Sequence, residues 1–200
     1  MRKIILASRS IARRKLLKDL GLKFVVARAD IKEKRSNKRP CRNLVITNAL
    51  KKAEKVRKKF NKGVIIAADT IVLSGNKMIT KPKNMKEAFK MLKIISKKPQ
   101  WVYTGIAVMD IENNKVFTDF EKTKIYMYPL NDKEIKNYFK RVNPLDKAGS
   151  FDIQGLGSIF INRIEGCFYN VVGLPLAKLG RILKKLKIDI FTTDTNRRKK

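Results

Sequence analysis

The sequence predicts an α/β fold in one domain over residues 1–191, followed by a polar, basic tail at 192–200. Short apolar segments alternate with amphipathic helical segments, which is typical of strand–helix units. Two segments of alternating apolar residues, 102–108 and 116–126, flank a turn at 112–114, which is typical of an antiparallel pair. Together these observations favour a mixed α/β body with a central antiparallel section.

The first half of the chain predicts three strands and two helices. Residues 3–7 form a strand, and a tight turn then leads to Ser10, which can cap a helix that ends at Gly21. A short strand follows at 24–27. Apolar residues then recur at helical spacing over 44–60, and residues 63–73 read as a buried strand.

The second half adds the antiparallel pair and three more helices. Gly75 and Asn76 mark a turn, a short strand precedes Lys81, and residues 85–95 form an amphipathic helix. Asp132 is expected to cap the next helix. A long glycine-bearing loop covers 143–157, a strand follows at 159–161, and Pro175 opens the last helix, which reaches residue 186.

The composition indicates a folded protein with an unusually positive charge. The 200 residues are 44% apolar, and 48 Lys and Arg against 17 Asp and Glu give a formal charge of +31. Such a charge attracts polyanions, which include nucleotides, RNA and anionic membrane surfaces. The alternative is a general lysine bias that covers solvated faces, and no basic run in the sequence is interleaved with the aromatic residues expected of a strand-binding protein.

The lack of histidine restricts the possible chemistry. With no histidine and only Cys41 and Cys167, zinc sites of the Cys/His type and a histidine general base are excluded. Any metal must therefore bind to oxygen ligands. The two cysteines predict reduced thiols in a cytoplasmic protein, and no apolar stretch in the sequence reaches membrane-spanning length.

Asp69 is the most informative candidate residue, because it interrupts the buried strand at 63–73. An unpaired carboxylate there would have a large desolvation cost. A metal ion, a cationic phosphate-binding site or a shifted pKa would each compensate it, and these are typical of active sites. The competing interpretation is an Asp that caps a turn at the end of a strand.

Weaker candidates surround this one. Ser8, Ser10 and Arg13 lie where the first strand meets the first helix, a junction that favours an anion. Lys52 and Lys81 are further cations, although a surface role is common in so basic a chain. Gln154 lies in the glycine-bearing loop and offers both a donor and an acceptor for a base edge.

Taken together, these segments resemble the Maf family of nucleoside triphosphate pyrophosphatases. The family's signatures occur in order as LASRS and Arg at 6–13, KA at 52–53, ADT at 68–70, KP at 81–82, YTG at 103–105, DKAGSFDIQG at 146–155 and NVVGLP at 170–175. The resemblance covers residues 3 to about 186. It implies an elongated, inosine-triphosphatase-like mixed sheet, with two lobes around a central cleft, and metal-dependent cleavage of a nucleoside triphosphate to the monophosphate and pyrophosphate.

The resemblance also implies roles for individual residues. Asp69 becomes the catalytic residue, either as a ligand of Mg²⁺ or Mn²⁺ or as the base that activates water, and Glu33 a second metal ligand. The substrate-binding residues become Ser8, Ser10, Arg13, Lys52, Thr70, Lys81 and Gln154. A homodimer is implied as well, and the ADT and IQG combination resembles the branch that acts on dTTP and UTP.

Two features keep other hypotheses open. Ile11 and Ala12 replace the family's usual Pro-Arg pair, which removes one cation from the phosphate-binding turn. That change and the +31 charge motivate a non-catalytic nucleotide- or RNA-binding protein on the same scaffold. A third hypothesis is a housecleaning enzyme for purine triphosphates such as those of inosine.

Overall fold

In the computed structural model, which describes residues 2–34 and 41–191, one seven-stranded mixed sheet runs the length of the molecule. The strand order is β2-β1-β3-β5-β6-β7, and β4 pairs with β3 beyond the end of β1. β1 is parallel to β2 and β3, whereas the pairs β3–β4, β3–β5, β5–β6 and β6–β7 are antiparallel. The expected mixed α/β fold is confirmed.

The strands differ greatly in length. Three short strands, β1 (Ile4–Leu6), β2 (Phe24–Val26) and β4 (Lys77–Ile79), lie beside the long strand β3 (Val64–Ser74). β5 (Gln100–Asp110) and β6 (Lys115–Met127) form the central antiparallel pair, and β7 (Ile161–Glu165) pairs with the end of β6.

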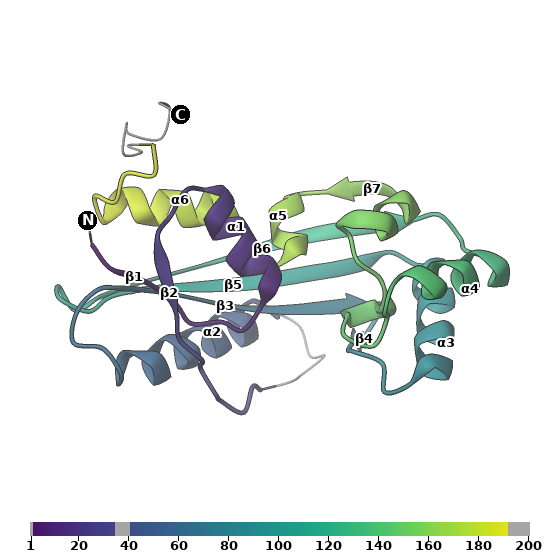
Figure 1. Cartoon of the computed structure of the whole chain (residues 1–200), viewed down its shortest axis with the longest axis horizontal. Coiled ribbons are helices and arrows are strands. Elements are labelled where there is room, and N and C mark those ends of the chain that lie inside the picture. Colours follow the sequence, from purple (N-terminus) through teal and green to yellow (C-terminus); the bar gives the residue numbers. More distant parts are fainter. Residues whose placement is uncertain (1, 35–40, 192–200) are drawn as a thin grey trace.

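The helices gather into two lobes at opposite ends of the sheet (Figure 1). One lobe contains α1 (Ile11–Asp19), α2 (Cys41–Arg57) and α6 (Leu176–Lys185). The other contains α3 (Met85–Ile95), α4 (Asp132–Arg141) and two 3-10 helices, η1 (Ala148–Ser150) and η2 (Gly155–Phe160). The short helix α5 (Phe168–Val172) packs on β5 and β6 between the lobes.

Separate apolar clusters lie on the two faces of the sheet. In the first lobe, α1 and α6 pack on one face through residues such as Leu17 and Leu183, and α2 packs on the opposite face through Ala49 and Ala53. In the second lobe, α3 and α4 bury Leu92 and Ile135. The long strands are shared by all of these clusters, so they hold the two lobes on one rigid element.

α2 approaches β5 very closely at Gly105. A Cβ atom at this position would lie 2.4 Å from the carbonyl carbon of Val45 and 2.6 Å from the amide nitrogen of Ile46. Real Cβ atoms do not come so near to backbone atoms. Gly105 therefore allows α2 to lie close against the sheet. Asp69 is the residue of β3 directly opposite Gly105.

The local predictions for the first half of the chain are largely confirmed. Ser10 is the N-cap of α1, and its hydroxyl accepts a hydrogen bond from the Arg13 backbone N–H at 3.3 Å. The helix predicted over 44–60 begins three residues earlier and ends three residues earlier, at Cys41 and Arg57. Part of the basic segment before it, residues 35–40, lies outside the described residues.

Two predictions for the second half are wrong in detail. Asn131, not Asp132, caps α4, because Asn131 and Glu134 form a reciprocal capping box that places Asp132 inside the first turn. The apolar run at 159–161 is not a strand. Its first two residues belong to η2, where the Ser158 hydroxyl donates to the Gly155 carbonyl at 2.7 Å, and β7 begins only at Ile161.

The loop predicted over 143–157 and the segment after β7 contain short helices that the sequence analysis did not identify. η1 and the first half of η2 lie within the loop, and α5 follows β7. The tail at 192–200 lies outside the described residues. Among the described residues, no helix has the length and apolar character needed to cross a bilayer.

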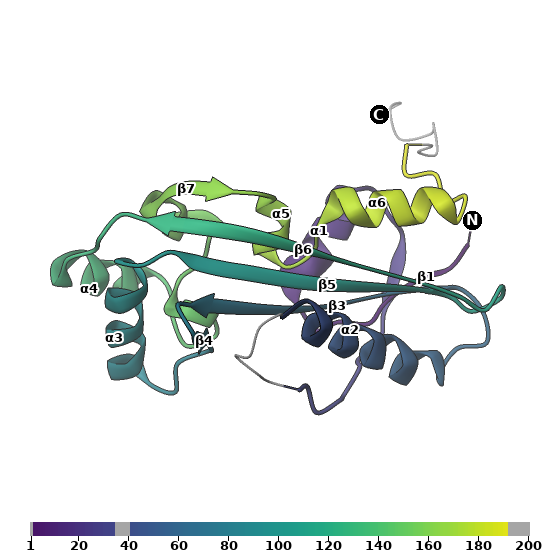
Figure 2. The ribbon, with the colours of Figure 1, turned by 180° about the vertical axis from the view of Figure 1, so that it is seen from behind.

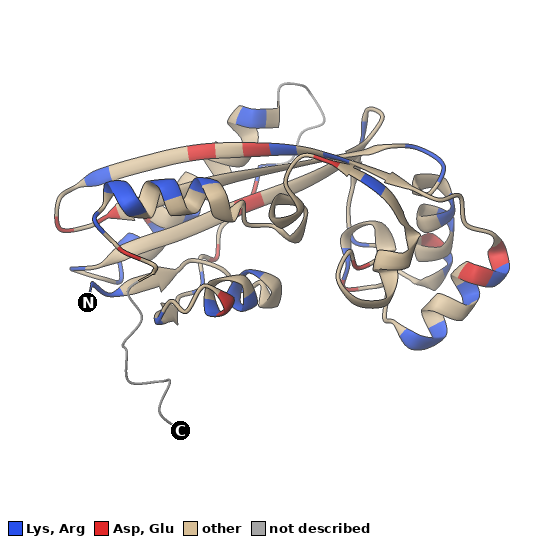
Figure 3. Cartoon of the chain, turned by 90° about the horizontal axis from the view of Figure 1, so that it is seen from above, with Lys and Arg blue, Asp and Glu red and all other residues tan. Residues whose placement is uncertain are grey.

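Positive charge is spread over both ends of the molecule and is not gathered on one element (Figure 3). Acidic residues are fewer than basic ones. This distribution fits the interpretation that much of the +31 charge covers solvated faces.

Candidate active site

The candidate site lies at an unpaired stretch of one edge of β3. β1 pairs with this edge up to Ile66, and β4 pairs with it only from Val72 onward. Between these two pairings, residues 67–71 have no strand partner on that side among the described residues. Backbone groups of this stretch are therefore available to side chains, and the ADT sequence lies at its centre.

Two cations meet at this edge. The carbonyl of Ala68 accepts a hydrogen bond from the Lys52 ammonium at 3.2 Å and another from the Arg13 guanidinium at 3.0 Å. Lys52 comes from α2 and Arg13 from α1, so the two lobe helices on opposite faces of the sheet both reach the same peptide group. The edge thus gathers positive charge, which would favour a bound anion.

Asp69 is 2% exposed, and both of its oxygens are paired. Oδ1 accepts from Lys52 Nζ at 2.7 Å, and Oδ2 accepts from Asn48 Nδ2 at 2.8 Å. Lys52 Nζ also lies 2.6 Å from Glu33 Oε1. One ammonium therefore joins the two carboxylates that the sequence singled out, and this pairing compensates the desolvation cost of Asp69.

Asn48 is the site residue that sequence reasoning missed. It is fully buried, and besides its bond to Asp69 its amide exchanges two hydrogen bonds with the backbone of Lys34, at 2.9 and 3.0 Å. It therefore ties the segment that carries Glu33 to the carboxylate of Asp69. A signal was present, because Asn48 lies three residues after Val45 and four before Lys52 and so shares the buried face of α2.

Arg13 is buried, and its donors are engaged within the protein. Nε donates to the Gly173 carbonyl at 2.7 Å, and a terminal nitrogen donates to the Thr70 hydroxyl at 2.8 Å. Burial lowers the pKa of the Arg13 guanidinium, whereas Asp69 and Glu33 act to raise it. Arg13 thus connects α1, the edge of β3 and the GLP end of the NVVGLP motif at 173–175. These hydrogen bonds fix the position of its charge.

The two predicted serines form the turn between β1 and α1. The Ser8 hydroxyl accepts the Ser10 backbone N–H at 3.2 Å and lies 3.4 Å from an Arg13 nitrogen. Ser10 caps the helix. Both hydroxyls therefore lie beside the positive end of α1 and next to Arg13, as the predicted phosphate cradle requires.

Thr70 connects the edge of β3 to the C-terminal motif. Its hydroxyl lies 2.9 Å from the hydroxyl of Thr104, which in turn donates to the Asn170 carbonyl at 3.1 Å. Asn170 is fully buried and donates to Val102 and Thr123. This chain of hydrogen bonds holds the NVVGLP segment against β5 and β6.

Lys81 and Gln154 are the two predicted residues that the structure does not bring into contact with the others. Lys81 is exposed, after β4. The pKa of Asp146 is lowered, mainly by a hydrogen bond from Lys147 and in part by the charge of Lys81, which places Lys81 near the DKAG segment. The side chain of Gln154 makes no hydrogen bond to any described residue. Both belong to the second lobe.

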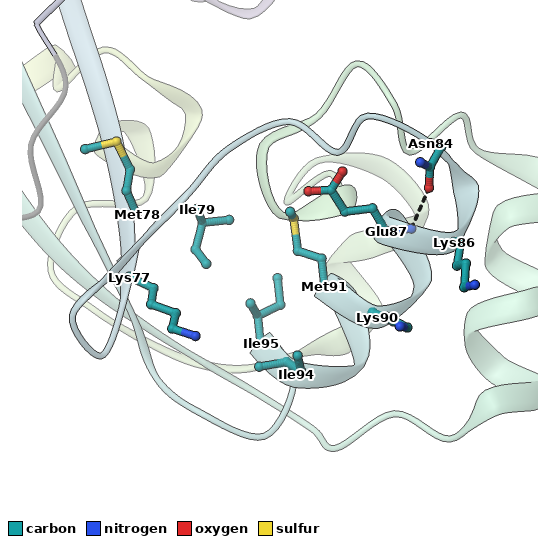
Figure 4. A pocket seen from close by; sticks show the side chains of 10 residues that line it. All are labelled: Lys77, Met78, Ile79, Asn84, Lys86, Glu87, Lys90, Met91, Ile94 and Ile95. Carbon is teal, nitrogen blue, oxygen red and sulfur yellow. Dashed lines mark hydrogen bonds between the residues drawn. The ribbon is translucent and has the colours of Figure 1, made fainter.

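Two hollows are present in the second lobe, and neither contains a predicted site residue. One, of about 520 Å³, lies between β4 and α3, where Ile79, Met91, Ile94 and Ile95 form an apolar wall (Figure 4). The other, of about 430 Å³, lies between α4 and η2. The central cleft therefore stays a prediction.

The oxygen atoms of Asp69 and Glu33 are the donors that could hold a divalent cation. Both are carboxylates, they converge on one cationic group, and Mg²⁺ commonly binds to one or two carboxylates together with substrate phosphates. No group of three or more Asp, Glu or Cys side chains suited to a metal occurs within residues 2–34 and 41–191. The donor set thus fits a metal shared with a substrate better than a fully protein-bound one.

Comparison with known proteins identifies the family. The Maf family, described as "Maf-like protein", matches residues 3–186 of this chain. This range includes every residue of the site described above. The chain belongs to the Maf family. Maf relatives named "dTTP/UTP pyrophosphatase" come from Caldicellulosiruptor saccharolyticus (42% identical, covering 96% of this chain and 98% of the relative), Methanosarcina barkeri (41%, 96% and 98%) and Thermoanaerobacter sp. strain X514 (44%, 92% and 96%).

Solved structures show a more distant likeness to this Maf chain. The Ham1 protein of Staphylococcus aureus is 18% identical with a TM-score of 0.47, covering 92% of this chain and all of that protein. A nucleoside-triphosphatase, also titled dITP/XTP pyrophosphatase, from Mycobacterium abscessus is 13% identical with a TM-score of 0.45, covering 92% and 98%.

Proposed function

We propose that this Maf protein hydrolyses dTTP, UTP or modified pyrimidine nucleoside triphosphates to the monophosphate and pyrophosphate, with the help of a divalent cation. The observation that carries the proposal is the cluster of buried Asp69 and Lys52 with half-buried Glu33 at the unpaired edge of β3. The names of the Maf relatives support the choice of substrate.

Asp69 and Glu33 would hold the cation, which would neutralise phosphate charge when bound. A carboxylate accepts about four hydrogen bonds, and each oxygen of Asp69 uses one within the described residues. Each oxygen therefore keeps room for a further partner, either the cation or an attacking water. The two bonds from Lys52 and Asn48 fix the direction in which the remaining lone pairs point.

The cations of the site would have different roles in binding the triphosphate. Arg13 is held by protein acceptors, so its charge acts on a bound anion from a fixed position. Lys52 connects the two carboxylates and lies beside the same edge. Lys81, which is exposed, is the cation free to donate directly to a phosphate oxygen. Ser8 and Ser10 add hydroxyl donors at the positive end of α1.

Base selection is assigned to the second lobe. Gln154 offers a carbonyl and an amino group on a side chain that makes no hydrogen bond to the described part of the chain, and one such amide can pair with the edge of uracil or thymine. A purine triphosphate enzyme would need the same site to accept a larger base. We further propose a cytoplasmic enzyme that acts as a homodimer, as expected from the resemblance.

A pyrophosphate-release assay tests the proposal. The panel contains dTTP, UTP, CTP, dATP, GTP and inosine triphosphate, each with Mg²⁺, with Mn²⁺ and with a chelator. We expect fast release from dTTP or UTP with metal and none with chelator. Fast pyrophosphate release from inosine triphosphate alone would establish the purine hypothesis. No release from any nucleotide would contradict the proposal and favour the hypothesis of a non-catalytic nucleotide- or RNA-binding protein.

A further inference from the structure

A continuous ladder of aromatic and cationic side chains crosses β5, β6 and β7. We call it the β5–β7 platform, and it consists of Tyr103, Lys122, Trp101, Lys124, Tyr126 and Arg163. Lys122 Nζ lies 3.9 Å from the ring centre of Trp101 and 5.8 Å from that of Tyr103. Lys124 Nζ lies 5.2 Å from Trp101 and 4.7 Å from Tyr126, and Arg163 Cζ lies 4.4 Å from Tyr126.

The strand register places all six side chains on one face of the sheet. Tyr103 is opposite Lys122, Trp101 is opposite Lys124, and Tyr126 is opposite Arg163. Directly opposed residues of antiparallel strands point to the same face, and residues two apart on a strand do so too. The platform is therefore a surface of three adjacent strands, with aromatic and cationic groups in alternation.

Five of the six platform residues, all except Tyr103, are exposed or half-buried. Figure 2 shows no helix in front of this part of β5 and β6, between α2 and α3. Lys122 is exposed, the Arg163 side chain is 59% exposed, and Trp101 and Tyr126 are half-buried. The first turns of α2 reach this face as far as Tyr103, which is 6% exposed and packs in one apolar cluster with Cys41 and Val45, so Tyr103 is the covered inner end of the platform.

The charge of the platform is positive. Among the described residues, the carboxylate that lies beside its cations is Glu165, which pairs with Arg163 at 2.8 Å and accepts the Tyr126 hydroxyl at 3.2 Å. Cation–π contacts at exposed positions are weak. The cations are thus held in an ordered row and remain able to bind an anion.

We propose that the β5–β7 platform binds single-stranded nucleic acid, a function beyond the proposed hydrolysis. Proteins that bind single strands combine cations for the phosphates with aromatic rings on which bases stack, and an open sheet surface is a common support. A duplex keeps its base faces stacked on one another, so the platform selects unpaired strands. The platform shares no residue with the candidate active site around Asp69 and Lys52, so binding does not need Asp69.

The chain provides its own probe, because Trp101 is the only tryptophan in the sequence. The experiment titrates the full-length protein with an oligouridylate of about 12 nucleotides, within the site sizes of such surfaces, and records Trp101 fluorescence together with the anisotropy of a labelled strand. Inorganic polyphosphate of similar charge and a duplex of the same length serve as comparison ligands. Each titration is repeated at several salt concentrations.

We expect the oligouridylate to quench Trp101 and polyphosphate to leave it nearly unchanged, because only bases stack. Three phosphate contacts predict a slope of about −2 for log affinity against log salt concentration. Tyr126→Ala should lower the affinity about tenfold through the loss of one stacking contact. Lys122→Gln with Lys124→Gln should lower it more than Lys184→Gln with Lys185→Gln, a matched pair of exposed lysines on α6.

The proposal is overturned if both lysine pairs have the same effect, if the duplex binds as tightly as the single strand, or if binding leaves Trp101 unchanged. Each of these results means that the general charge alone attracts the ligand. Sedimentation of the same samples gives a further test. If the protein forms a dimer in which a second copy covers Trp101, and this dimer does not bind the oligouridylate, the proposal is overturned as well. Asp69→Asn is expected to retain full binding, so failure of the proposed hydrolysis and failure of this proposal are distinguishable.

Discussion

The two sides of the candidate site differ in how far their polar groups are already paired. On the side of the first lobe, Asp69, Lys52, Asn48 and Arg13 are buried and bonded to one another or to the backbone. On the side of the second lobe, Lys81 is exposed and the Gln154 side chain has no hydrogen-bond partner among the described residues. Under the proposed function, the first side would fix the geometry before substrate binds, and the second would keep its donors for the substrate.

This comparison predicts a division in kinetics. Changes on the paired side should lower kcat, because they disturb groups that act on the reacting phosphate. Changes on the unpaired side should raise KM, because they remove contacts formed only with the ligand.

Asp69→Asn should have the largest effect. The substitution keeps the shape of the side chain but removes the charge that would bind a metal or accept a proton, so kcat for dTTP or UTP should fall on the order of a thousandfold or more. The measurement is steady-state pyrophosphate release at saturating metal. Circular dichroism serves as the fold control, since the change also leaves Lys52 with a weaker partner. A variant as active as the parent would refute the role of Asp69.

Asn48→Leu tests whether the paired side depends on positioning as well as on charge. Leucine has a similar size but cannot bond to Asp69 or to the backbone of Lys34. We expect a 10- to 100-fold loss of kcat, the approximate size of effects from partners that orient a site carboxylate. A raised metal requirement should accompany it, which a change in fold stability alone would not cause. Equal metal dependence in parent and variant would contradict the positioning role.

Lys81→Met tests the unpaired side. The loss of one charged hydrogen bond to a phosphate costs about 1.5–3 kcal/mol, so KM should rise about tenfold or more while kcat changes less. Lys83→Met, at an exposed lysine two residues away, is the matched control. If both substitutions act alike, Lys81 contributes only to the general field.

The smallest effect is expected far from both sides, where Arg2 pairs with Asp110 and holds its pKa at about 2. Because this pKa lies below the ordinary value of 3.8, the pair stabilises the folded state above about pH 4, and the contribution is lost as the pH falls toward 2. Arg2→Gln should therefore lower the free energy of unfolding by roughly 2 kcal/mol at pH 7 and by much less near pH 2. Urea unfolding at both pH values measures this, and kcat at pH 7 should stay unchanged.

Much of the fold could be predicted because its elements follow local rules. The strand with Asp69, the Ser10 cap and the helix at 85–95 each show a periodic pattern or a capping residue within a few positions. The capping residue of α4 and the start of β7 were missed because they depend on which of two neighbouring groups forms a hydrogen bond. Sequence pattern cannot decide between such close alternatives.

The site could be predicted in part for the same reason. Asp69 attracted attention because a charge in an apolar run is unusual, whereas Asn48 is polar in a very basic helix and does not stand out there. The β5–β7 platform was missed because its residues come from three strands. β6 contains two of the cations and one ring, and only the register brings Trp101 from β5 and Arg163 from β7 beside them.

The lack of a side chain at Gly105 restricts which substitutions this protein can tolerate at that position. A single added methyl group there would meet the main chain of α2 at Val45, so the helix would have to lift from the sheet. Lys52 and Asn48 would move away from Asp69 with it, even if every other contact survived. Gly105 thus sets the distance between α2 and β5. A chain with any larger residue at this position would keep its overall fold but lose the arrangement of the candidate site.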